Sequence, residues 1–290
     1  MRPPGSQREW RRASCARWRH EAEDVLTSAN TQHLLSAAGV VATADGPILR
    51  VRLDRPDKHN AQTPSMWAAL AALGDDLPEG IRVVILSGAG QSFSAGLDRR
   101  MFVEGLPGEA SLVGLAEKPA SEVEDIIAGY QRAFTWWRER PVVTIAAVQG
   151  HAIGAGFQLA LACDLMIVEA TASLSMKEIQ LGLVPDLAGT LPLVRAVGYQ
   201  RALELCLTGR AISGDEAAAI GLAITAVPEG QAAAAADDLA AGITAAAPNA
   251  TTAVLGLIRG AHGRDLAEQT AAERAAQYGR ITELAALMQR

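Results

Sequence analysis

The residues with the clearest chemical potential lie between positions 148 and 190, where a glycine-rich turn precedes a single carboxylate. An apolar run predicts a buried strand, and residues 154–156 (Gly-Ala-Gly) then open a helix whose first N–H groups have no partner within that helix. Such N–H groups can stabilise a developing negative charge. A second strand then delivers Glu178, whose carboxylate can move a proton. Together the two parts predict chemistry through an enolate.

The composition is that of a globular chain with an acidic balance. Its 290 residues include 26 Lys and Arg against 32 Asp and Glu, which gives a net charge of −6, and 49% of them are hydrophobic. This length allows a large domain with a substantial core and a smaller appendage. The negative charge argues against nucleic acid or an anionic membrane surface as the main partner.

Cysteine usage and the lack of long apolar runs indicate where the protein resides. Three widely spaced cysteines without a CxxC pair argue against a disulfide framework and against a zinc site. No apolar run reaches the roughly 18 residues that a membrane helix needs, and the N-terminal arginines are not followed by the apolar core of a secretory signal. We therefore expect a cytoplasmic protein with no metal, no nucleic acid and no membrane partner.

Hydrophobic periodicity predicts an α/β fold in which strands alternate with helices. Apolar or alternating runs indicate strands within residues 48–56, 81–90, 142–150, 164–170 and 222–229. Asn60 is the expected N-cap of the helix that follows the first of these strands. The long connection 99–140 is expected to contain a mobile loop and then an amphipathic helix.

Changes in pattern along the chain divide it into three regions. Residues 1–38 are predicted to form a basic, loosely attached N-terminal extension. Residues 39–230 hold the alternating strands and helices of the core. Residues 231–290 are rich in alanine and helical in pattern, so they must pack on the core or on another subunit.

Several linked blocks resemble the crotonase (enoyl-CoA hydratase/isomerase) superfamily in their order and approximate spacing. They are RPDKHNAQ, VVILSGAGQSFSAGLD, AAVQGHAIGAGFQLALACDL, KEIQLGLVPDLAGT and LTGRAISGDEAAAIGLAITAVP, and they cover about residues 46–228. The resemblance implies a crotonase-like spiral of ββα turns with a helical C-terminal region that makes subunit contacts in a homotrimer or a dimer of trimers. It also implies an acyl-CoA thioester substrate and no separate cofactor, because coenzyme A is part of that substrate.

The same resemblance places an oxyanion hole on the backbone N–H groups of Leu97, in SAGLD, and Ala155, in GAG. Two such donors on a thioester oxygen would stabilise an enolate, each by about 3 to 4 kcal/mol if the value for acyl transfer applies. Taken alone, the glycine spacing is better explained by tight packing of a strand on a helix. The SFSAGLD block upstream favours the oxyanion hole.

Hydratases of this family hold a water between two glutamates, and the chain departs from that pattern. Glu178 fills the second position, but Gln158 fills the first. An amide can orient a water, yet it cannot exchange the proton at neutral pH. We therefore expect a single-base enzyme in which Glu178 removes a proton α to the thioester and returns it further along the chain, shifting a double bond. Hydration of 2-enoyl-CoA and an acyl-CoA-binding protein without activity are the alternatives.

The sequence allows two interpretations for each of two acidic side chains. Asp186 lies where dienoyl-CoA isomerases of the family carry an aspartate, which would make it a second acid, although a surface or helix-capping role is equally consistent with its sequence context. Glu178 could be a solvated glutamate paired with Lys177, but its position in the family block favours catalysis. Burial beside apolar walls would raise its pKa and suit it to proton transfer.

The resemblance also suggests where coenzyme A binds, along RPDKHNA and SFSAGLD. The residues expected to contact it are Lys58, Ala61, Ala95, Leu97, Asp98 and Gly154. The chain lacks the EGxxAFxEKR-like stretch with which family members commonly cover the nucleotide. A dinucleotide-binding fold and a serine hydrolase are disfavoured because neither a GxGxxG motif at the required place nor a complete GxSxG motif occurs.

Overall fold

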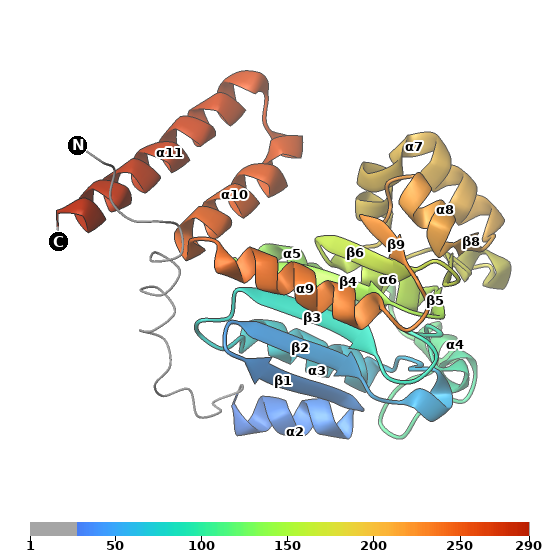
Figure 1. The fold of residues 1–290 in the computed structure, drawn as a ribbon. Coiled ribbons are helices and arrows are strands. Elements are labelled where there is room, and N and C mark those ends of the chain that lie inside the picture. Colours follow the sequence, from blue (N-terminus) through green and yellow to red (C-terminus); the bar gives the residue numbers. More distant parts are fainter. Residues whose placement is uncertain (1–27, 290) are drawn as a thin grey trace.

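The structure, a computed structural model, describes residues 28–289 and places them in two β-sheets surrounded by helices (Figure 1). Within these residues, the larger sheet has six strands in the order β1-β2-β3-β4-β6-β9 and the smaller has three in the order β5-β7-β8. β1 and β2 are antiparallel, and the other neighbours in the larger sheet are parallel, as crossover connections require. The strands are β1 (Val40–Asp45), β2 (Ile48–Leu53), β3 (Val83–Gly88), β4 (Val143–Val148), β5 (His151–Ile153), β6 (Leu165–Glu169), β7 (Ser173–Ser175), β8 (Ile212–Ser213) and β9 (Thr225–Val227).

Helices connect these strands and extend the chain beyond the last of them. The α-helices are α2 (Ala29–Ala37), α3 (Pro64–Asp75), α4 (Leu112–Leu115), α5 (Ala120–Glu139), α6 (Ala155–Ala162), α7 (Thr190–Thr208), α8 (Gly214–Ala219), α9 (Ala232–Ala245), α10 (Pro248–Gly260) and α11 (Leu266–Met288). Short 3-10 helices are η1 (Pro56–Lys58), η2 (Arg99–Phe102), η3 (Glu178–Leu181) and η4 (Ala261–Gly263). The five strands predicted from periodicity correspond to β2, β3, β4, β6 and β9, and the amphipathic helix predicted within residues 99–140 is α5.

The larger sheet is covered on both faces, because successive side chains of a strand point to opposite sides. On one face, residues such as Leu49, Val84 and Ala146 pack in a hydrophobic core with α3, α5 and α6. On the other, residues such as Val83 and Ile145 pack against the alanine-rich helix α9. Alanine allows α9 to approach the sheet closely, which is why so little bulk is enough to cover this face.

Short segments beside the larger sheet form a second layer, which we call the second wall. It consists of the smaller sheet and of the segments around Gln62, Ser94 and Leu97, and its parallel contacts define the spiral. Gln62 forms a parallel bridge with Leu97, Ser94 forms one with Ala152, and β5 pairs in parallel with β7. Each turn of the chain therefore contributes one strand to the sheet and one short segment to this wall, which is the ββα spiral that the family resemblance implied. The segments predicted to carry the chemistry all belong to this wall.

The first helix after β2 begins later than predicted. Thr63 is the N-cap of α3, and its side chain accepts a hydrogen bond from the N–H of Met66. Asn60 is buried instead, where its side-chain amide donates to the carbonyl oxygens of Ala89 and Ser92 at 2.8 and 2.7 Å. The prediction of Asn60 as the cap was wrong because the amide serves a contact between distant loops, which local sequence cannot reveal.

The terminal regions differ in how closely they join the core. Residues 1–27 of the predicted N-terminal extension lie outside the described residues, whereas α2 packs on the core through Leu35. At the other end, α10 and α11 extend away from the sheet as a pair (Figure 1), and neither contains a buried residue. Among residues 28–289 no single helix is long and apolar enough to cross a bilayer; α9 and η4-extended α10 meet that test only as a pair bent by 111°.

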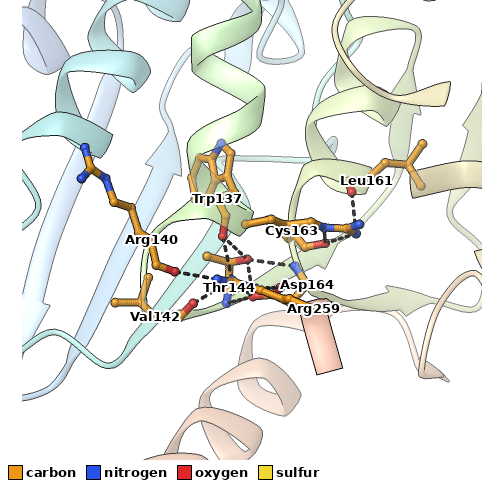
Figure 2. A network of polar contacts seen from close by, with 9 residues as sticks. Trp137, Arg140, Val142, Thr144, Leu161, Cys163, Asp164 and Arg259 are labelled. Atoms are coloured by element: carbon orange, nitrogen blue, oxygen red, sulfur yellow. Dashed lines mark hydrogen bonds and ion pairs between the residues drawn. The ribbon is translucent and has the colours of Figure 1, made fainter. Parts of the chain in front are cut away.

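Arg259 fastens α10 to the core through a network of polar contacts (Figure 2). Its guanidinium donates to both carboxylate oxygens of Asp164, at 2.9 and 2.6 Å. It also donates to the carbonyl oxygens of Trp137, Arg140 and Val142 at the end of α5 and the start of β4. The two charged side chains are only 20% and 12% exposed, so each satisfies the other in a largely dry setting.

Replacing Arg259 by Met should therefore destabilise the protein. The change removes the ion-pair partner of Asp164, and we expect the free energy of unfolding to fall by about 2 to 4 kcal/mol, at the lower end of the range for buried pairs because some water reaches the site. Urea unfolding measures the loss. Arg201→Met, which breaks an exposed pair with Glu204, is the control and should cost less than about 1 kcal/mol. Equal effects of the two changes would contradict the anchoring role of Arg259.

Candidate active site

Two glycine-containing segments of the second wall lie against each other. The N–H of Ser94 donates to the carbonyl of His151 at 2.8 Å, and the N–H of Ile153 donates to the carbonyl of Ser94 at 3.0 Å. There is no room for side chains between them, since a Cβ added to Gly96 would lie 2.4 Å from the carbonyl oxygen of Ile153. A Cβ on Gly156 would lie equally close, 2.4 Å, to that of Ser94. Glycine at these positions therefore permits the close approach of the two backbones.

The predicted oxyanion donors, Leu97 and Ala155, lie on these adjoining segments. Ala155 is the first residue of α6, and neither its N–H nor that of Leu97 has an acceptor among residues 28–289. A Cβ built on Gly96 would be 3.5 Å from the Ala155 nitrogen, so the peptide that ends at Leu97 is a direct neighbour of the helix start. Two unpartnered N–H groups therefore lie on adjoining segments, and that of Ala155 is at a helix N-terminus, where negative charge is favoured.

A buried polar cluster that the sequence interpretation missed holds these segments in place. Gln62 is fully buried and donates to the Ser94 hydroxyl at 3.1 Å and to the carbonyl of Ala155 at 3.3 Å. Its amide oxygen accepts from the indole N–H of Trp67 at 2.7 Å. The Ser94 hydroxyl donates to the carbonyl of Asn60 at 2.8 Å. Gln62 and Ser94 lie in the RPDKHNAQ and SFSAGLD blocks, but nothing in the sequence alone shows that they meet.

Glu178 follows β7 and is the first residue of η3, so it stands just after the strand that was expected to carry it. One carboxylate oxygen, Oε1, accepts from the Gln158 amide at 2.8 Å. The other, Oε2, is buried and has no hydrogen-bond partner within the described part of the chain. A Cβ on Gly154 would lie 3.2 Å from Oε1, which places the carboxylate directly beside the start of α6. No ion pair joins Glu178 to Lys177 among residues 28–289.

Burial changes the acidity of the groups around Glu178. It raises the pKa of the Glu178 carboxyl, and the charge of Asp186 nearby raises it further, while the hydrogen bond from Gln158 acts in the opposite direction. Burial likewise raises the pKa of Asp186. The pKa of the Cys206 thiol in α7 is raised by burial and then by the charge of Glu178. Glu178 and Asp186 are therefore both poised to hold a proton more readily than an exposed carboxyl.

Gln158 is buried in α6 and both ends of its amide are bonded to the protein. Its oxygen accepts from the backbone N–H groups of Leu187 and Gly189, at 2.9 and 3.3 Å, while its NH₂ faces Glu178. The loop that supplies these N–H groups turns sharply, since Ala188 has a positive φ of 61°. The amide oxygen is thus occupied by backbone N–H groups and the NH₂ by Glu178, so both ends of the amide are bonded within the protein.

Asp186 lies at the start of this loop and does not cap α7, whose N-cap is Gly189. Its backbone carbonyl accepts from Gln131 of α5 at 2.7 Å. The next residue, Leu187, is held by Gln158, so the main chain of Asp186 is fixed on both sides. The carboxyl group is close enough to Glu178 for the two charges to interact. The structure therefore brings Asp186, Gln158 and Glu178 together.

The residues predicted to contact coenzyme A lie in or just after η1, in the SFSAGLD segment and just before α6. Lys58 is exposed in η1, and the Ala95 N–H donates to the carbonyl of His59 at 2.8 Å, which joins the two predicted blocks. Asp98 is buried and its carboxylate is engaged by Arg55 and Arg100, whose hydrogen bonds and charge hold its pKa well below the usual range. Ala61 is half-buried, and its carbonyl accepts from Arg55. Within residues 28–289 no group of three His, Cys, Asp or Glu side chains could hold a metal ion.

Comparison with known proteins relates this geometry to a family. The family model described as enoyl-CoA hydratase/isomerase matches residues 43–285. The chain belongs to this family. It is an enzyme of the enoyl-CoA hydratase/isomerase family with the α/β crotonase fold and a helical C-terminal region, as the resemblance in the sequence implied.

Individual family members resemble the chain over most of its length. A Thermobifida fusca YX protein that is named among the enoyl-CoA hydratases, solved in complex with acetoacetyl-CoA, is 47% identical with a TM-score of 0.84, covering 88% of this chain and 100% of that one. An enoyl-CoA hydratase structure from Polaromonas sp. JS666 is 30% identical with a TM-score of 0.74, covering 83% and 91%. Carnitinyl-CoA dehydratase of Salmonella enteritidis PT4 is 34% identical over 221 residues, covering 75% of this chain and 78% of the relative.

The raised pKa values in this enoyl-CoA hydratase/isomerase family site have a consequence for stability. The fold disfavours the charged form of Glu178. The free energy of unfolding of the protein therefore falls as the pH rises through the raised pKa that Glu178 has in the folded state. Glu178→Gln, which keeps the shape and the acceptor for Gln158, should raise the free energy of unfolding at pH 8. Urea unfolding at several pH values should show that the difference in unfolding free energy between Glu178→Gln and the parent protein shrinks towards pH 4, near the ordinary pKa of a glutamate. Exposed Glu229→Gln is the control, and a destabilised Glu178→Gln protein at pH 8 would contradict the argument.

Proposed function

We propose that the protein shifts the double bond of an enoyl-CoA thioester, with Glu178 as the single base. The observation that carries the proposal is the buried, unpartnered Oε2 of Glu178, which lies beside a helix start that offers the unpartnered N–H of Ala155. A base of raised pKa next to anion-stabilising donors is the combination that enolate chemistry requires. Gln158, bonded at both ends of its amide, supplies no second base.

The proposed reaction needs only proton transfers. Glu178 takes the proton from the carbon α to the thioester of a 3-enoyl-CoA, and the electron pair moves onto the thioester oxygen to form a dienolate. The N–H groups of Leu97 and Ala155 donate to that oxygen and stabilise its charge, by about 3 to 4 kcal/mol each if the value for acyl transfer applies. The protonated Glu178 then returns the proton to the fourth carbon, which yields the 2-enoyl-CoA and restores the carboxylate.

Hydration or dehydration of the thioester is the second candidate, and Asp186 is the observation that favours it. This carboxyl lies near Glu178 and also has a raised pKa, so it could act as the second acid that Gln158 cannot be. The relatives named as hydratases and as carnitinyl-CoA dehydratase support reactions of this kind. The retained Glu178 argues against the inactive acyl-CoA binder that the sequence left open as an alternative.

The substrate class is proposed from the relatives and from the second wall. The Thermobifida fusca structure in complex with acetoacetyl-CoA supports an acyl-CoA ligand for this chain. In that proposal the coenzyme A portion lies along the segments that carry Lys58, Ala61, Ala95 and Asp98, and the thioester lies beside Leu97 and Gly154. Asp98 would act by fixing the turn through Arg55 and Arg100, since its carboxylate is already occupied by them.

The predicted homotrimer or dimer of trimers stays a proposal that surface composition supports. The protruding α11 exposes Leu266, Tyr278, Ile281, Leu284, Leu287 and Met288. On α7, Leu191, Tyr199, Leu203 and Leu207 are exposed as well. Apolar faces of this extent are typical of surfaces that are covered in an assembly.

Substrate preference tests the reaction. We expect the purified protein to convert 3-enoyl-CoA to 2-enoyl-CoA faster than it hydrates 2-enoyl-CoA, because Gln158 cannot replace a second glutamate. Thioester absorbance follows both reactions across a series of acyl chain lengths. A protein that hydrates faster than it isomerises would refute the preference for isomerisation, and affinity for acyl-CoA without any turnover would favour the inactive binder.

Substitution of Glu178 tests whether this residue is the base. Glu178→Gln should abolish turnover while acyl-CoA affinity, measured by calorimetry, changes by less than about threefold, since the amide keeps the volume and the hydrogen bond but cannot accept the proton. Exposed Glu79→Gln is the matched control and should leave turnover unchanged. Turnover that survives in Glu178→Gln would exclude Glu178 as the base.

A further inference from the structure

We propose that Gln158 is a positioning residue that fixes both carboxyl groups of the site, rather than a group that acts on water or substrate. The structural part of this inference stands on the contacts of Gln158, and its kinetic part rests on the proposed function. Gln158 is 1% exposed and belongs to α6, whose first N–H is the proposed oxyanion donor. Its side chain joins three separate parts of the site.

The hydrogen bonds determine which end of the amide faces which group. Two backbone N–H groups, of Leu187 and Gly189, point at one end, and only an oxygen can accept from them. The NH₂ must then face Oε1 of Glu178, where a donor is required by the carboxylate. The orientation therefore follows from the donors of the loop and needs no assumption about the amide itself.

The consequence for Glu178 is that its two oxygens have different tasks. Oε1 is held by Gln158 and lies against Gly154, where a Cβ would come within 3.2 Å. Oε2 is left as the buried oxygen with no partner among the described residues, so it is the one that can receive a proton. By donating to Oε1, Gln158 also favours the ionised form of Glu178 against the effect of burial.

The consequence for Asp186 comes through the loop that follows it. The amide oxygen draws the N–H groups of residues 187 and 189 to one point, which the chain achieves with a left-handed turn at Ala188. Gly189 is needed for this approach, because a Cβ there would lie 2.7 Å from Cγ of Gln158. With Gln131 bonded to the Asp186 carbonyl from the other side, Gln158 sets where that carboxyl stands relative to Glu178.

Two substitutions separate positioning from space filling. Gln158→Met keeps the volume and removes every hydrogen bond, whereas Gln158→Glu keeps an acceptor for the loop and replaces the donor by a second carboxylate. The control is Gln269→Met in α11, whose amide is also bonded at both ends, to Arg264, Leu257 and Glu273, far from the site.

Hydrogen–deuterium exchange of peptides covering residues 183–190 tests the loop without any substrate. In Gln158→Met the amides of Leu187 and Gly189 lose their acceptor, and we expect them to exchange at least about tenfold faster. In Gln158→Glu and Gln269→Met this exchange should stay as slow as in the parent protein. Unchanged exchange in Gln158→Met would overturn the proposal even if the protein turned over no thioester, so its failure is separate from that of the proposed reaction.

The pH profile of turnover tests the effect on Glu178. The groups whose charges interact with Glu178 are Asp186 on the following loop and Cys206 on α7, and both substitutions leave them in place. Loss of the donor in Gln158→Met should raise the pKa of Glu178, so the acid limb of kcat/KM should move to higher pH while kcat falls at least about tenfold and KM changes less than about threefold. In Gln158→Glu two adjacent carboxylates share a proton, and the limb should move further in the same direction.

A merely structural role would give a different pattern. It would lower the amount of folded protein and leave the position of the acid limb unchanged in both variants. That outcome, or a Gln158→Met protein with the kinetics of Gln269→Met, would overturn the assignment of Gln158 as a positioning residue.

Discussion

The hydrogen bond from Gln158 to Glu178 is the interaction on which the rest of the site depends. It places a carboxylate against the start of α6, where glycine leaves just enough room, and it leaves one buried oxygen without a partner. The same amide ties the loop after Asp186 to the core. Without this side chain, the burial that raises the pKa of Glu178 would favour a protonated and displaced carboxyl.

The spiral explains how residues so distant in sequence reach one place. Each turn adds a strand to the covered sheet and a short parallel segment to the second wall, so positions 62, 97 and 155 become neighbours. Few backbone hydrogen bonds join the segments of this wall, and hydrogen bonds of buried side chains such as Gln62 and Ser94 hold the segments in place. Polar groups that are buried and fully bonded in this way specify one geometry, which a site made of main-chain N–H groups requires.

Much of the fold could be predicted from the sequence, because apolar periodicity is a local property. The core strands and α5 were found in this way, and the order of the blocks identified the family over most of the chain. Asn60 was assigned wrongly as a cap, and Gln62 was not noticed, since both bond to loops about 30 or more residues away. The sequence also suggested that Gln158 departs from a two-glutamate pattern, but only the structure shows that its oxygen is already bonded to residues 187 and 189.

Ala188 has a strained backbone conformation in the loop between Asp186 and α7, next to the proposed catalytic groups. A left-handed alanine costs about 1 to 2 kcal/mol relative to an ordinary conformation, a penalty that glycine would largely avoid. The exposed methyl group meets no obvious need in packing. A glycine here would make the turn easier to form, but it would also allow the loop many other conformations. The carboxyl groups of Asp186 and Glu178 would then no longer be held in a single arrangement. The hydrogen bonds from residues 187 and 189 to the glutamine oxygen hold this strained conformation in place, and its strain is released when that acceptor is lost.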